Sequence, residues 1–233
     1  MLDGLEPDPR VIDRDRNQPE RVRPLWEYVE FAASDQRTEA GRSAQAQHAA
    51  TLQSIAETYS VDPGVVTAIW GLESAYGRIQ GDFDIVRSLA TLAWDGRRRG
   101  FAEAQLRAVA RMIERGYADR DELKGSWAGA MGHTQFIPTT YLERAVDFDA
   151  DGRRDIWTDV GDALASAANL LKNAGWREGA PVAVAVTLPE GFDFAGWDER
   201  RRRPVAEWAM EGVAPVGDAA FTTDALNGRA RLI

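Results

Sequence analysis

The chain has 233 residues, of which 28% are charged and 44% hydrophobic, a composition that is typical of a globular protein and excludes a disordered one. Its net charge of −9 argues against a general nucleic-acid-binding role, and the absence of cysteine excludes disulfides, thiol nucleophiles and cysteine-ligated metals. No apolar run reaches the roughly 18 residues of a membrane span, and residues 1–10 lack the pattern of a signal peptide.

The N-terminal part is predicted to be an extended arm followed by two helices. Residues 1–23 are rich in Pro, Asp and Arg, which favours an arm that wraps a core. Apolar spacing predicts a short amphipathic helix over 25–33 and one longer helix over 38–59. His48 lies on the apolar face of the longer helix, so we expect a packed side chain there and not a metal ligand.

The stretch VVTAIWGLESAYG, residues 65–77, predicts a buried helix. Asp62 followed by Pro63 is a favourable helix start, because Asp caps free amides and Pro loses no hydrogen bond in the first turn. Three apolar residues recur at helical spacing and predict the buried face. These residues are Val65, Ile69 and Leu72.

Glu73 follows this apolar surface, near the end of the helix that Gly77 is expected to terminate. A carboxyl group against apolar surface has its charged form disfavoured and its pKa raised, which suits a general acid at neutral pH. The alternative is an ordinary glutamate, paired with Arg78 or solvated. Asp82 and Asp84 follow shortly after Glu73, and the sequence leaves open whether either one lies at the same site.

Two apolar helices are expected next, over 88–94 and 101–117, and the turn DGRRRG at 95–100 joins them. Three arginines between two glycines form either a solvated turn or an anion clamp, since arginine holds carboxylates bidentately. Residues 125–138, GSWAGAMGHTQFIP, have three glycines in an apolar segment. Such a segment predicts either a binding loop or a tight structural turn.

Residues 147–155, DFDADGRRD, match most of the calcium-loop template. Acidic side chains stand at relative positions 1, 3, 5 and 9 and glycine at 6, while position 7 contributes only its backbone carbonyl. Thr158 replaces the usual glutamate at position 12, so Asp159 or Asp162 would have to complete the ligand set. We expect a structural calcium site that holds a helix over 160–174; an ordinary acidic turn is the alternative.

The sequence pattern changes from Gly179 onward. Residues 181–188, PVAVAVTL, predict a strand, and short apolar pieces with Gly and Pro turns follow. The terminal sequence ARLI predicts a strand that ends without a closing turn or cap. This part is therefore predicted to be a small β-rich unit.

Five blocks in order resemble the B-type lytic murein transglycosylases, periplasmic enzymes that cleave bacterial peptidoglycan: DRNQPE at 15–20, GLESAYG at 71–77, the 125–138 segment, the calcium loop, and DALASAAN at 162–169. The resemblance implies a mainly α protein with a small β part (α+β), with a lysozyme-like helical core and an EF-hand-like calcium loop. It divides the chain into an N-terminal arm and helical part (1–60), the catalytic core (61–178) and a small, apparently truncated β domain (179–233).

The resemblance also implies the functional residues. It implies Glu73 as the sole catalytic acid and base. It implies five substrate contacts, three along the glycan cleft and two to the acidic stem peptide: Ser126, Met131, Gln135, Arg98 and Arg99. It implies structural Ca²⁺ held by Asp147, Asp149, Asp151, the Arg153 carbonyl and Asp162, with no organic cofactor. The expected partner is the peptidoglycan glycan strand, not nucleic acid, and the expected location is the periplasm.

The implied reaction uses one carboxylate. Glu73 would protonate the glycosidic oxygen between MurNAc and GlcNAc and then take a proton from the C6 hydroxyl, whose attack on C1 gives 1,6-anhydroMurNAc. The alternatives are a lysozyme-like muramidase that uses water, and an inactive glycan-binding fragment. The chain departs from the family pattern at two places. Leu170 stands where many relatives carry a cleft tyrosine. The C-terminal segment that returns to the core in the family is expected to be missing.

Overall fold

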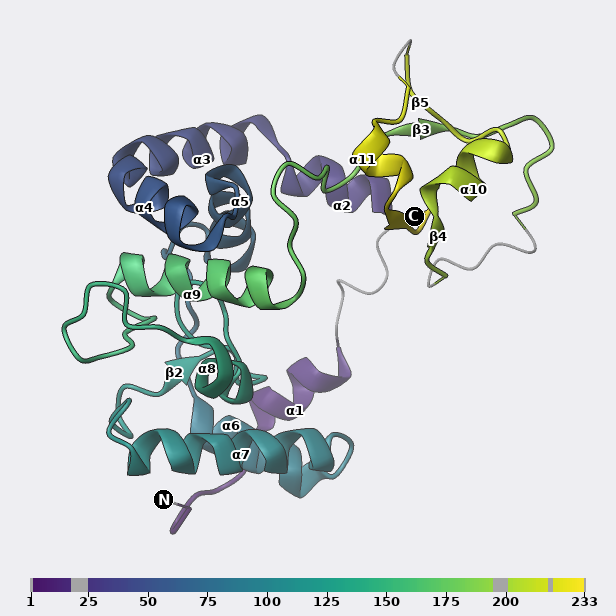
Figure 1. The fold of residues 1–233 in the computed structure, drawn as a ribbon. Helices are drawn as coiled ribbons and strands as arrows, with labels where there is room; N and C mark the ends of the chain where they lie inside the picture. The colour runs from purple at the N-terminus through teal and green to yellow at the C-terminus, as the bar shows by residue number, and fades with distance from the viewer. Residues whose placement is uncertain (1, 18–24, 195–200, 218–219, 233) are drawn as a thin grey trace. The chain divides into compact units, whose positions relative to one another are not determined.

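The structure of the protein is a computed structural model that describes residues 2–17, 25–194, 201–217 and 220–232 (Figure 1). The chain divides into two compact units, Met1–Trp176 and Arg177–Ile233. The expected further division at residue 60 stays a prediction. Within the described ranges, no helix is long and apolar enough to cross a membrane.

The first unit is built from helices and one short antiparallel strand pair. The pair joins β1 (Phe83–Asp84) to β2 (Lys124–Gly125), with Phe83 opposite Gly125. The helices are α1 (Pro9–Arg16), α2 (Leu25–Ala32), α3 (Asp35–Gln47), α4 (Ala49–Tyr59), α5 (Pro63–Ser74), α6 (Ile85–Asp95), α7 (Arg99–Glu114), α8 (Pro138–Arg144) and α9 (Val160–Asn173).

The predicted extended arm contains a helix, α1, so that prediction is wrong for residues 9–16. The Asp8 carboxylate accepts the backbone N–H of Arg10 at 3.0 Å and Pro9 occupies the first turn, which together start the helix. Val11 is completely buried against α6 and fixes the helix on the core. The rest of the arm, residues 18–23, lies outside the described residues.

The single helix expected over 38–59 is two helices, α3 and α4, that meet at His48. His48 has φ −108° and ψ 23°, which interrupts the helix. The break allows α3 to pack on α5 while α4 packs on α9. The His48 ring is packed edge-on against Trp70, with ring centroids 5.3 Å apart, which confirms the expectation of a packed histidine.

Helix α9 is at the centre of the first unit and contributes to two hydrophobic clusters. It lies between α8 on one side and α4 and α5 on the other (Figure 1). Ala163 belongs to the cluster with α6, α7 and α8, and Leu164 and Ala168 belong to the cluster with α3, α4 and α5. Residues 162–168 are all buried, as a helix surrounded by protein on all sides requires.

The second unit combines short strands with short helices. Strand β3 (Val186–Thr187) pairs with β5 (Ala214–Pro215), and β4 (Arg203–Pro204) pairs with β6 (Arg229–Ala230). The helices are α10 (Val205–Met210) and α11 (Thr223–Leu226). The strand predicted over 181–188 is therefore reduced to two residues. The whole described chain is mainly α with a small antiparallel β part, as the sequence predicted.

Candidate active site

Helix α5 starts where the sequence predicts, but its buried face differs. The Asp62 carboxylate accepts backbone N–H groups of residues 64 and 65, at 2.6 and 3.3 Å. The buried positions include Val66, Trp70 and Ser74. The face predicted to be buried is only half-buried at Val65 and Ile69, and Leu72 is 47% exposed. Both faces are apolar, and packing against α3 and α9 selects the one that is buried.

The segment after α5 is left-handed, and the helix ends earlier than expected. Ala75 has φ 50° and Tyr76 has φ 61°, so the chain turns directly after Ser74 and before Gly77, at φ 80°. Each left-handed non-glycine residue costs roughly 1–2 kcal/mol. The Tyr76 hydroxyl donates to the Arg37 carbonyl oxygen at 2.9 Å, which helps to hold the turn. Strain of this kind clusters at functional sites.

A buried polar network ties the end of α5 to the glycine-rich segment. The indole N–H of Trp70 donates to Nδ1 of His133 at 2.9 Å, and the Ser74 hydroxyl donates to the His133 carbonyl oxygen at 2.6 Å. The Ser74 oxygen in turn accepts the backbone N–H of Gly77 at 2.9 Å. Burial lowers the pKa of His133, so the ring is neutral at pH 7 with Nδ1 as acceptor.

Glu73 projects from the open side of this helix end. Its side chain keeps access to solvent, yet the surrounding protein removes enough water from the carboxyl group to raise its pKa. Among the described residues its carboxylate accepts no hydrogen bond and forms no ion pair. The Arg78 guanidinium donates instead to the Ala75 carbonyl oxygen at 2.9 Å. The pairing of Glu73 with Arg78 is therefore not observed.

The glycine-rich segment forms the loop opposite the end of α5. The Ser126 hydroxyl oxygen accepts the backbone N–H of Ala130 at 3.0 Å. Gln135 is left-handed, with φ 52°, and its side-chain amide donates to the Gln80 carbonyl oxygen at 3.1 Å. A Cβ on Gly81 would lie 2.3 Å from the carbonyl oxygen of residue 125, so glycine is required for the two loops to meet.

Met131 is placed differently from the expectation. Its side chain is completely buried in the cluster of α6, α7 and α8, so it lies beneath the loop and does not line an open surface. The reason is local pairing: its backbone forms isolated β-bridges to Gly125 and Phe136, which turn the side chain into the core. Leu170, noted as a departure, is half-buried against the same cluster.

The arginine turn is partly engaged in structure. Arg98 lies 3.6 Å from the Asp15 carboxylate and 4.4 Å from the centroid of the Phe101 ring, and the Trp127 ring next to Ser126 is 6.0 Å away. Arg99 is exposed at the first position of α7. Arg97, which the sequence analysis did not single out, donates to the Asp15 carbonyl oxygen at 2.7 Å and pairs with its carboxylate.

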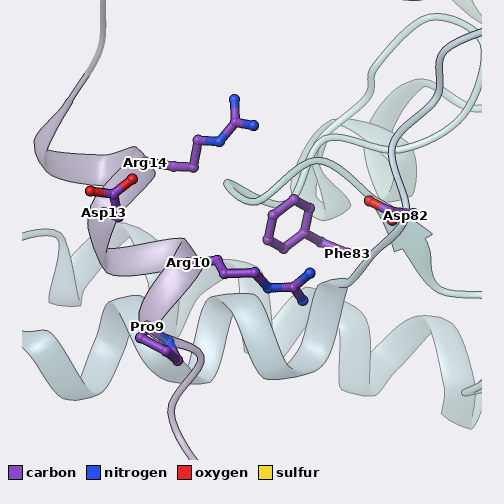
Figure 2. Close-up of a pocket in the computed structure, with 6 residues that line it drawn as sticks. All are labelled: Pro9, Arg10, Asp13, Arg14, Asp82 and Phe83. Carbon is purple, nitrogen blue, oxygen red and sulfur yellow. The ribbon is translucent and has the colours of Figure 1, made fainter.

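Asp82 and Asp84, the two carboxylates that follow Glu73, lie in surroundings that differ from those of Glu73. Asp84 caps α6 by accepting the backbone N–H of Arg87 at 2.9 Å, and it pairs with Arg120 at 2.6 Å. Asp82 lines a cavity beside α1 (Figure 2). Asp84 is thus used in capping and ion pairing, and Glu73 remains the carboxylate at the end of α5.

The acidic loop brings three carboxylates together. Oxygens of Asp147, Asp149 and Asp162 lie within 4.8 Å of one another. Asp162 is buried at the start of α9 and accepts backbone N–H groups of Phe148 and Asp155, at 2.6 and 2.7 Å. Burial raises the pKa of Asp162, which a cation beside the carboxylate would oppose.

Asp151, another predicted ligand, is oriented differently. The carboxylate of Asp151 accepts the backbone N–H of Arg153 at 2.7 Å and does not belong to the close group. Gly152, at position 6 of the loop, has φ 94°, as the sharp turn of such a loop requires. The three close carboxylates are all-oxygen donors and fit a divalent cation such as Ca²⁺.

Comparisons with known proteins identify the class of protein that this fold and site define. The transglycosylase SLT domain family matches residues 1–233, and the chain belongs to this family. It is 36% identical over 165 residues to membrane-bound lytic murein transglycosylase B of Escherichia coli (strain K12), which covers 68% of this chain and 44% of that protein.

Solved structures confirm the lysozyme-like fold and the resemblance to the B-type enzymes. SltB3 of Pseudomonas aeruginosa, in complex with NAG-anhNAM-pentapeptide, is 46% identical with a TM-score of 0.91, covering 100% of this chain and 62% of that one. The lytic transglycosylase SLT35 of Escherichia coli, in complex with calcium, is 28% identical with a TM-score of 0.83, covering 100% of this chain and 72% of that one. The chain thus spans less than two thirds of the length of lytic murein transglycosylase B and of SltB3.

Proposed function

We propose that this chain carries the activity of a peptidoglycan lytic transglycosylase, which cleaves the β-1,4 bond between MurNAc and GlcNAc and forms 1,6-anhydroMurNAc. The observation that carries the proposal is the position of Glu73, a carboxyl group with a raised pKa on the open side of a rigidly held helix end. Family membership and the complex of SltB3 with an anhydro-sugar peptide support the choice of substrate.

The proposed reaction needs Glu73 in two protonation states. The protonated carboxyl donates its proton to the glycosidic oxygen as the bond to MurNAc C1 breaks. The carboxylate then accepts the proton of the MurNAc C6 hydroxyl as that oxygen bonds to C1. Because the substrate supplies the nucleophile, the second carboxylate of ordinary glycosidases is not required. The raised pKa keeps part of the population protonated closer to neutral pH.

The other predicted site residues are proposed to bind substrate. Ser126 and Gln135 lie on the loop that faces the end of α5, where their polar groups would contact the N-acetyl sugars. Arg98 and Arg99 are proposed to meet the carboxylates of the stem peptide. Met131 would not contact the substrate; its buried side chain would support the glycine-rich loop from the core.

We also propose that the acidic loop holds a structural calcium ion. Asp147, Asp149 and Asp162 would supply carboxylate oxygens, with Asp151 and the Arg153 carbonyl completing the set after a small rearrangement. When bound, the ion would neutralise the clustered carboxylates and join the loop to the start of α9. The calcium complex of SLT35 supports this proposal. The proposed partner is the glycan strand, and the proposed location is the periplasm.

Digestion of purified sacculi tests the function. Mass spectrometry of the released fragments should show 1,6-anhydroMurNAc ends. Fragments heavier by one water would indicate the lysozyme-like muramidase reaction instead. Release of neither product, with binding of the sacculi retained, would indicate a glycan-binding fragment without activity.

A further inference from the structure

A cavity of about 540 Å³ lies between α1 and the start of β1, outside the group of residues around Glu73 (Figure 2). Its lining comes from two segments: Pro9, Arg10, Asp13, Arg14, Asp82 and Phe83. Figure 2 shows Arg10 and Arg14 extending from α1 on either side of the Phe83 ring, and Asp82 beyond that ring. Asp13 points away from it.

The charged groups of the cavity differ in whether they already have partners. Arg10 donates to the Asp8 carboxylate at 2.8 and 3.1 Å and lies 4.8 Å from the centroid of the Phe83 ring. Asp13 accepts the side-chain amide of Asn17 at 2.9 Å. Within the described part of the chain, Arg14 and Asp82 make no hydrogen bond or ion pair; Asp82 has only a longer-range attraction to Arg10. One cation and one anion are therefore available beside an aromatic ring.

The wall of the cavity is preformed. Helix α1 is joined to α6 through the Asp8 backbone N–H, which donates to the Thr91 hydroxyl at 3.0 Å. Its other end is held by the ion pair between Arg16 and Asp95, at 2.8 Å. A ligand would bind without first ordering this helix, which lowers the entropic cost of binding.

The cavity borders the strand pair that leads into the glycine-rich segment. Phe83 pairs with Gly125, and the next residue is Ser126. Phe83 and Trp127 pack against the same small buried cluster, formed by Val11, Leu92 and Ala102. Arg98 lies over this same aromatic group, 6.0 Å from the Trp127 ring. The cavity therefore lies next to the segment that is proposed to contact the glycan at Ser126.

We propose that this cavity binds the outer part of the stem peptide of peptidoglycan, an inference that rests on the proposed function. A free carboxylate of the peptide pairs with Arg14, and an amide N–H or ammonium group donates to Asp82. The presence of both charges decides the ligand class, because Asp82 and Asp13 repel a polyanion and a neutral sugar has no charge for Arg14. A peptide that carries both acceptor and donor groups satisfies both.

Calorimetry on the full chain tests this binding site. The two ligands are GlcNAc-MurNAc-pentapeptide and the same disaccharide without peptide; neither contains a MurNAc–GlcNAc bond, so neither is cleaved. In Arg14→Ala and in Asp82→Asn, we expect the ratio of the two affinities to fall about tenfold, as loss of a hydrogen bond to a charged group implies. Arg115→Ala and Asp121→Asn, which are exposed at the far end of α7 and after it, should leave the ratio unchanged.

The outcomes separate this inference from the proposed function. A fall in the ratio for the two cavity variants supports the peptide site, even if the chain releases no anhydro product from sacculi. An unchanged ratio, or an equal fall in the control variants, overturns the peptide site even if the chain is active. Melting temperatures equal to that of the wild type establish that the cavity variants are folded.

Discussion

At the scale of single residues, the proposed activity depends on Glu73, whose carboxyl group ionises less readily than that of an ordinary glutamate. Glu73 has no cation or hydrogen-bond donor of its own among the described residues, and burial raises its pKa. An ordinary surface glutamate would gain a solvation shell or an arginine partner. The raised pKa means that ionisation of Glu73 lowers the stability of the folded protein, and perturbed carboxyl groups of this kind are more frequent at functional sites.

This cost predicts a pH-dependent effect of Glu73→Gln. Because the folded-state pKa is raised, the folded protein holds this proton more tightly than the unfolded chain. Wild-type stability linked to this group is full below the ordinary glutamate pKa of about 4.3 and is lost as pH rises through the folded-state value. We therefore expect Glu73→Gln to melt higher than the wild type at pH 7, with a difference that disappears near pH 4.

Thermal melts at the two pH values measure this effect. The exposed Glu114, at the end of α7, offers a control for the removal of one carboxylate as Glu114→Gln. A Glu73→Gln difference that is the same at both pH values would contradict the raised pKa.

At the scale of elements, the site depends on the close meeting of α5 with the glycine-rich loop. The backbone at Gly77 packs directly against the His133 ring of this loop, since a Cβ there would lie 2.2 Å from the ring. The sequence predicted the helix, its cap and Glu73 from local signals, because Asp62 and Pro63 act on their neighbours. It could not predict which apolar face is buried, because that choice depends on tertiary contacts. The hydrogen bond between Trp70 and His133, for example, joins residues that are 63 positions apart in the sequence.

Gly77→Ala is expected to destabilise the protein by about 2–4 kcal/mol, from left-handed strain plus overlap with the His133 ring. Gly116→Ala is a matched control: its φ is 68°, but no atom lies within 4 Å of the added Cβ. Strain alone should make the control cost about 1 kcal/mol. Denaturant midpoints compare the two. Equal losses would show that contact with His133 does not constrain this turn.

Calcium is expected to stabilise the acidic loop and the start of α9. At free calcium a hundredfold above Kd, binding to the native state adds about 2.7 kcal/mol. The melting temperature should rise with millimolar calcium and fall with chelator. Asp149→Asn should reduce the calcium-dependent rise, whereas Asp121→Asn should not. A melting temperature that is independent of calcium in metal-stripped wild type would contradict the site.

At the scale of the whole molecule, local signals predicted the order of elements better than their contacts. The mainly α composition and the family blocks followed from periodicity and motifs. The helix α1, the break at His48 and the role of Arg97 depend on distant packing; Arg97 and Asp15 are 82 residues apart in sequence. The strand predicted over 181–188 has β-branched residues at four of its eight positions, yet pairing with β5 extends over only two residues, Val186 and Thr187.

The most direct test of the central claim compares the wild type with Glu73→Gln on purified sacculi. The variant keeps the size of the side chain but cannot donate a proton to the leaving oxygen or accept one from the C6 hydroxyl. General acid–base catalysis contributes about 10² to 10⁴ in rate, and both proton transfers use this group, so the loss should lie at the upper end. We expect anhydro ends from the wild type and almost none from a folded variant. Anhydro product released by Glu73→Gln at a rate close to that of the wild type would contradict the assignment of Glu73 as the catalytic residue.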